Sequence, residues 1–79
     1  MDKLPPMYAI SWVDANASAG WHEIDDMEEA NKPTQIITLG FLISENKSSI
    51  LLAQGLSEDG GILNYNVIPK SWIVKRKRL

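Results

Sequence analysis

The residues best suited to chemistry in this 79-residue sequence are cations and a tryptophan close to its C-terminal end. Lysine and arginine bind anions, and an aromatic ring beside them can stack on a base, as in many proteins that hold nucleotides or single strands. The pattern predicts a site for an anionic ligand, a nucleotide or a single-stranded nucleic acid, formed by Lys70, Trp72, Lys75, Arg76 and Arg78. The alternative interpretation is that Trp72 caps the end of the fold and the charges only keep an edge strand soluble. The sequence pI of about 5.2 is far from that of duplex-binding domains, so double-stranded DNA is not the expected ligand.

Two further tryptophans, Trp12 and Trp21, flank a loop of small residues at 14–20. One interpretation is that both rings plug the ends of the fold. The other is that they form a stacking platform at the mouth of a pocket and belong to the ligand-binding residues. Tryptophan suits either role, because its ring is apolar and its N–H needs a partner.

Catalysis is not expected from this set of residues. The sequence has no cysteine, its one imidazole is His22, and no glycine-rich phosphate loop of Walker spacing is present. Asp14 and several serines could accompany His22 in a triad, but such a set is expected by chance. A transition-metal site would depend mostly on carboxylates, which are a poor zinc set, so we expect neither a metal nor a cofactor.

An acidic segment lies between residues 21 and 30, where no lysine or arginine occurs and the acids are Glu23, Asp25, Asp26, Glu28 and Glu29. These charges could neutralise the basic C-terminal end, within one chain or between neighbouring chains. Alternatively, the segment could contact a basic host protein, which would make the chain an inhibitor or adaptor of that factor. A catalytic carboxylate pair is not favoured, because nothing apolar nearby in sequence would raise a pKa.

The elements that must position these residues are mostly strands. Alternating apolar residues predict strands at 8–13, 34–44, 48–54, 62–68 and 73–79. A short helical segment is expected at 25–31, and a single 3₁₀ turn at Pro69–Trp72 separates the last two strands. The stretch at 35–44 is the longest β-branched-rich run, with two largely apolar faces, and is expected to be a central strand covered at least in part on both sides.

Gly40 should mark a bend or a close backbone approach in that central strand. The side chains expected in the core are Leu39, Phe41, Leu52, Leu63, Tyr65 and Val67. In the strand at 62–68 this choice places Asn64 and Asn66 on the outward face.

The order of these elements is similar to that of the small five-stranded barrels of the SH3 and Sm type. The resemblance rests on order and spacing after Pro6 and implies a mainly β barrel with one short helical segment and a 3₁₀ turn before the last strand. The Sm-type RNA-binding signature is absent, since Asp59-Gly60-Gly61 is only a hairpin turn. An OB-type barrel would need a helix between its third and fourth strands, for which there is no room.

A second resemblance concerns the sequence itself. Trp12-Val13-Asp14, Gly20-Trp21, Thr38-Leu39-Gly40-Phe41 and Ile68-Pro69-Lys70 resemble the Trp-x-Asp, Gly-Trp, Gly and Ile-Pro-Lys pattern of small phage-encoded proteins. The pattern does not cover residues 22–32. The resemblance implies a cytoplasmic protein in an infected bacterium, and it assigns no activity to any residue. By analogy, an anion-binding protein in that setting would act as a sponge for nucleotide defence signals.

Size bounds the remaining expectations. We expect a single domain, with a leader at 1–6 and a barrel at 7–79. A chain this short buries only about 60% of its unfolded surface, so a homo-oligomer is expected to support it in the absence of disulfides. No apolar run reaches the roughly 18 residues of a membrane helix, and no secretory signal is recognisable, so we expect a cytoplasmic protein that does not bind membranes.

Overall fold

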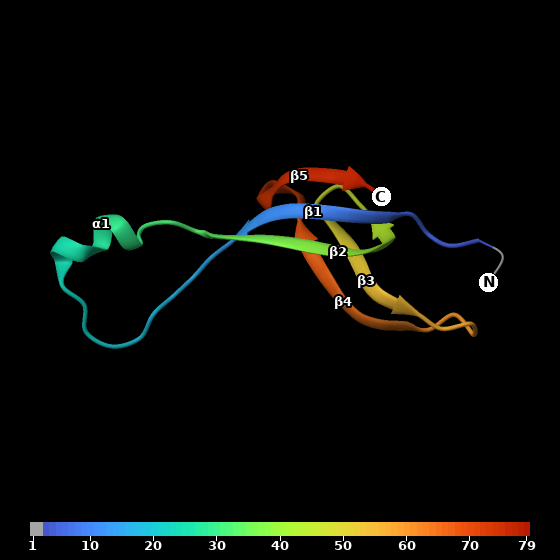
Figure 1. Cartoon of the computed structure of the whole chain (residues 1–79), viewed down its shortest axis with the longest axis horizontal. Helices are drawn as coiled ribbons and strands as arrows, with labels where there is room; N and C mark the ends of the chain where they lie inside the picture. Colours follow the sequence, from blue (N-terminus) through green and yellow to red (C-terminus); the bar gives the residue numbers. More distant parts are fainter. Residues whose placement is uncertain (1–2) are drawn as a thin grey trace.

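The computed structural model describes residues 3–79, which form one antiparallel sheet and a long arm (Figure 1). The five strands are β1 (Met7–Asp14), β2 (Thr34–Glu45), β3 (Ser49–Leu56), β4 (Ile62–Pro69) and β5 (Ile73–Arg78). They lie in the order β4-β3-β2-β1-β5, so β4 and β5 are the two edges of the described sheet. The mainly β prediction is confirmed, as is the 3₁₀ turn η2 (Lys70–Trp72) before the last strand.

β2 is shared by the two halves of the sheet. Its residues Thr34 to Phe41 pair with β1, and its residues Phe41 to Glu45 pair with β3. At the change of partner lies Gly40, where a Cβ atom would stand only 2.8 Å from the backbone oxygen of Ala53. The predicted close backbone approach is confirmed, because no side chain fits between the two strands at this point.

The buried core occupies one face of the sheet, called here the core face. Its largest fully buried side chains are Ile10, Ile50, Leu52 and Ile68. Packed against them are partly buried side chains from β1, β2 and β5: Tyr8, Trp12, Leu42 and Ile73. The core is therefore small and built chiefly from branched aliphatic residues on neighbouring strands.

The expected core was largely wrong. Leu52 is buried and Phe41 is half-buried, but more than half of the surface is exposed in each of Leu39, Leu63, Tyr65 and Val67. In β4, Ile68 pairs with the buried Ile50 and Asn66 pairs with the buried Leu52. Because paired residues share a face of the sheet, the asparagine face of β4 lies on the core side. The alternation of apolar residues separates two faces, but it does not say which face is covered.

The opposite face of the sheet is called here the outer face. It carries two cross-strand rows near β5, namely Lys75, Ser11 and Ile37, and then Lys77, Ala9 and Leu39. Ile37 is 72% exposed, so the outer face of β2 is open at this position, whereas Phe41 on the same face is half-buried. Neighbours in such a row lie close enough for their side chains to act together.

Two tight turns complete the sheet. Between β2 and β3, the side-chain oxygen of Asn46 accepts hydrogen bonds from the backbone N–H groups of Ser48 and Ser49, at 2.8 and 2.9 Å. Between β3 and β4, Gly60 adopts a positive φ of 94°, as expected for this glycine-rich turn. Both turns are local and exposed, so they set the register without adding to the core.

The arm consists of residues 15–33, between β1 and β2, and projects away from the sheet on the side opposite the turn between β3 and β4 (Figure 1). It contains a 3₁₀ turn, η1 (Ile24–Asp26), followed by α1 (Met27–Ala30), which confirms the predicted helical segment. Each of its residues is exposed. The arm makes the molecule 57 Å long against 23 and 21 Å in the other directions.

The base of the arm is closed by polar contacts. The Asn16 side-chain amide donates to the backbone oxygen of Lys32 at 2.6 Å and to the hydroxyl of Thr34 at 3.3 Å. These bonds hold the two ends of the arm together where they leave the sheet.

None of the helices in the described part of the chain has the length and hydrophobicity needed to cross a membrane.

Candidate binding surfaces

Trp12 and Trp72 form a stacked pair at one end of the core face. Their ring centroids are 6.3 Å apart and the ring planes are inclined by only 16°. Trp12 also donates its indole N–H to the Thr38 hydroxyl at 3.0 Å. Trp12 is half-buried and Trp72 is 39% exposed. The ring of Trp12 is therefore held within the sheet, while part of the surface of Trp72 is accessible to solvent.

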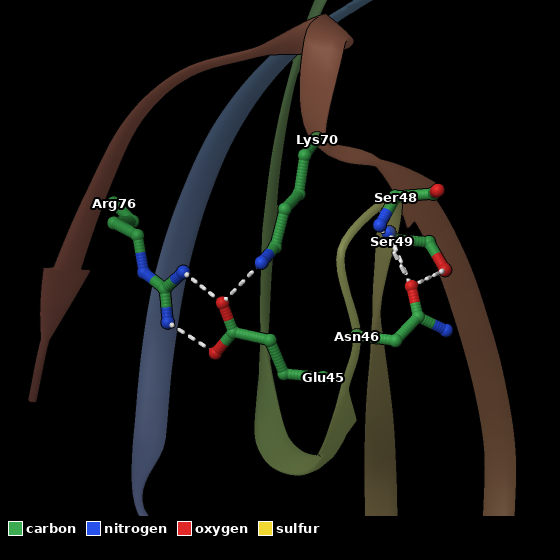
Figure 2. A network of polar contacts seen from close by, with 6 residues as sticks. All are labelled: Glu45, Asn46, Ser48, Ser49, Lys70 and Arg76. Carbon is green, nitrogen blue, oxygen red and sulfur yellow. Dashed lines mark hydrogen bonds and ion pairs between the residues drawn. The ribbon is translucent and has the colours of Figure 1, made fainter.

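Lys70 and Arg76 converge on one carboxylate, that of Glu45 (Figure 2). Arg76 contacts both carboxylate oxygens, at 3.2 and 3.3 Å, and the Lys70 ammonium lies 2.8 Å from one of them. The hydrogen bonds from Arg76 and Lys70 lower the pKa of Glu45 to about 2. Glu45 is thus a fixed anion that occupies these two predicted ligand-binding cations and joins β2 to η2 and β5.

The basic residues of β5 divide between the two faces. Arg76 and Arg78 pair with Ile10 and Tyr8 on the core face, and the Arg76 guanidinium lies 4.9 Å from the centre of the Tyr8 ring. Lys75 and Lys77 pair with Ser11 and Ala9 on the outer face. Residues 75, 77 and 78 form no ion pair within residues 3–79, where the ion pairs are those of Glu45.

The predicted site residues are therefore only partly brought together. Trp12 and Trp72 stack, Lys70 and Arg76 share Glu45, and Lys75 and Arg78 lie on opposite faces of β5. Trp21 is far from this group in the fold, since it lies on the arm and is fully exposed. The interpretation of Trp21 as a plug at the end of the fold is wrong, because the loop that carries it leaves the sheet.

The arm has a surface of its own. Trp21 and Ile24 are 102% and 87% exposed, and the five carboxylates of the acidic segment are exposed around them. A hollow of about 380 Å³ lies within the arm, lined by Asn16, Ala17, Ser18, His22, Met27 and Ala30. Large apolar side chains this exposed mark contact surfaces when they lie together, and here they stand within an anionic segment.

The outer face carries the opposite combination of charges. We define the outer patch as Ile37, Leu39, Val74, Lys75 and Lys77. Its three apolar members are 72%, 56% and 70% exposed, and they lie beside two lysines at the β5 edge. A hollow of about 180 Å³ is lined by Ile37 and Val74 together with Ser11, Trp12, Gln35 and Ile36.

Sequence reasoning did not find the outer patch. Val74 lies where the pairing of β5 with β1 shifts register, between the pairs Ser11–Lys75 and Trp12–Ile73. Such an irregularity gives the strand one more residue than its partner and moves a side chain away from regular alternation. The residue types in the sequence do not indicate this shift of register. Ile37 and Leu39 are residues of the kind found on a buried face, so their exposure could not be recognised from the sequence.

Other kinds of site are not found in the described residues. Within residues 3–79, no group of three or more His, Asp or Glu side chains is placed to hold a metal ion. Across the same residues, every buried side-chain nitrogen or oxygen has a hydrogen-bond partner. Comparison with models of protein families, with curated proteins and with solved structures gave no match.

Proposed function

We propose that this chain is a non-catalytic binding protein whose arm docks on a basic, partly apolar surface of a protein partner. The observation that supports this function is the full exposure of Trp21 and Ile24 within the acidic segment of the arm. Aromatic anchors of this kind supply much of the energy in protein interfaces, while flanking charges guide and select the partner. The proposal corresponds to the interpretation that the acidic segment makes the chain an inhibitor or adaptor of a host protein.

The architecture we propose for the sheet is a small barrel of the SH3 or Sm type. It is supported by the strand order, by the long β2 shared between both halves, and by the 3₁₀ turn between β4 and β5. Such barrels leave their loops free to vary, and the arm occupies the first loop. We propose a cytoplasmic phage protein, on the sequence resemblance alone.

The experiment is affinity capture from a bacterium that expresses a tagged and an untagged copy of the chain. Three tagged forms are compared: the wild type, Trp21→Ala with Ile24→Ala, and Leu63→Ala with Tyr65→Ala as a matched control on exposed residues of β4. We expect a polypeptide, which can be the untagged copy, to be captured by the wild type and the control but lost with the arm variant. Equal capture by all three forms would refute the proposed function.

A second candidate function is the binding of an anionic ligand on β5. It is favoured by Lys75, Lys77 and Arg78, which are exposed and have no carboxylate partner within residues 3–79. A nucleotide or single strand is the expected ligand class. Heat denaturation of the purified protein should then release a compound absorbing near 260 nm, and a chain that releases none and shows no nucleotide binding by calorimetry is not a protein of this kind.

A further inference from the structure

The arm and the outer patch are complementary in charge and in apolar character. The arm has five carboxylates against one lysine, Lys32, and exposes Trp21 and Ile24. The outer patch has two lysines and no acid, and exposes Ile37, Leu39 and Val74 beside a hollow of about 180 Å³. Complementary charges around apolar contacts are what distinguish a selected interface from an arbitrary hydrophobic one.

The two surfaces do not meet within one chain of this structure. The base of the arm is fixed by the bonds of Asn16 to Lys32 and Thr34, and the arm then leads away from β5 (Figure 1). Within residues 3–79, no ion pair joins a carboxylate of the arm to a cation of β5. The arm and the outer patch are therefore complementary but do not contact each other within the chain.

We propose that the partner of the arm is a second copy of this chain, with the arm of each copy lying on the outer patch of the other. This rests on the proposed function of the arm as a docking element and names its partner. In a dimer with two-fold symmetry, the contact between arm and outer patch is formed twice, so the buried areas of the two contacts add together. Stable interfaces bury about 1,200–2,000 Å² in total, and each copy contributes both a surface that docks and one that receives.

The test is a charge swap followed by sedimentation. The arm variant carries Asp25→Lys with Glu28→Lys, and the patch variant carries Lys75→Glu with Lys77→Glu. All four side chains are exposed, so both variants should keep the fold, which circular dichroism checks. Each variant alone places like charges opposite one another, and we expect its self-association to be weaker than that of the wild type by more than about tenfold.

Mixing the two variants provides the decisive step. In a one-to-one mixture, the lysines of one arm meet the glutamates of the other patch, and the remaining arm and patch keep their native charges. We expect the mixture to recover a mass of twice the 8.8 kDa chain, and added salt to weaken it because exposed charges are screened. A control variant carries Lys3→Glu with Lys47→Glu, at exposed lysines outside the outer patch. It changes the net charge by as much as the patch variant does, and it should associate as the wild type does.

The outcomes separate this inference from the proposed function. A wild-type chain that sediments at 8.8 kDa at about 100 μM overturns the inference, as does a mixture that fails to associate. If affinity capture then still returns another polypeptide in a manner that depends on Trp21 and Ile24, the arm is a docking element for a different protein. If capture depends on neither residue, both proposals fail.

Discussion

Glu45 joins three segments of the chain through its side chain. Its carboxylate joins the end of β2 to η2 through Lys70 and to β5 through Arg76, and all three side chains keep about a third of their surface exposed (Figure 2). Isolated surface ion pairs contribute little to stability, but a bidentate arginine with a second cation is a more favourable arrangement. The network also removes two cations from the predicted ligand site.

We expect acid to weaken this network in a defined range of pH. The pKa of Glu45 falls from 4.5 to about 2 in the folded chain, so the stability it contributes is present above pH 4.5 and is lost as the pH falls toward 2. Urea unfolding of the wild type and Glu45→Gln should therefore differ most near neutral pH and converge in acid. A difference that is unchanged between neutral pH and about pH 2 would contradict the role given to the carboxylate.

Gly40→Ala tests the close approach of β2 to β3. The new Cβ atom would lie 2.8 Å from a backbone oxygen that cannot rotate away, so we expect a loss of about 1–3 kcal/mol in the free energy of unfolding. Gly55→Ala is the matched control, because a Cβ there meets Leu63 at an ordinary distance of 3.4 Å. Equal effects of the two substitutions in urea unfolding would show that the strands are not in close contact at Gly40.

Among the elements, the strands and the 3₁₀ turn were predictable and the faces of the strands were not. All five strands, the close backbone approach at Gly40 and the helical segment follow from local residue patterns. Burial follows from how the sheet curves and which face it closes around, and no local pattern in β4 distinguishes Tyr65 from Ile68. The outer patch was missed for the same reason, since Ile37 and Leu39 look like core residues.

The assignment of faces leads to a direct comparison of two leucines. Leu52→Ala removes a fully buried side chain and should lower the free energy of unfolding by about 2–5 kcal/mol. Leu63→Ala removes a side chain that is 64% exposed and should change it by no more than about 0.5 kcal/mol. Equal losses in chemical denaturation would return Leu63 to the core and reverse the assignment.

The arm is expected to be dispensable for folding. Asp14 and Thr34 face each other in the ladder, and none of residues 15–33 is buried. Replacing residues 15–33 by Asn-Gly should give a two-residue hairpin between β1 and β2 and leave the urea midpoint close to that of the wild type. Loss of cooperative unfolding in this variant would show that the arm is part of the structural core rather than an attached docking element.

Across the whole chain, charges of opposite sign are concentrated on two separate elements. Five of the ten acidic residues lie on the arm and four of the eight basic residues lie on β5, while the net charge is only −2. A nucleotide on Lys75 and Lys77 would compete with the arm of a second copy, because both are anions at the same lysines. The two candidate functions are thus linked by one surface.

The docking of the arm on a second copy is tested most directly by a disulfide between the arm and the outer patch. The sequence contains no cysteine, so Ile24→Cys and Val74→Cys each introduce a unique thiol at an exposed position. We expect an equimolar mixture of the two variants to form a mixed disulfide dimer under mild oxidation. Ile24→Cys mixed with Leu63→Cys, an exposed position on β4, should form much less. A mixed dimer at Val74 that is no more abundant than at Leu63 would contradict the docking of the arm on a second copy.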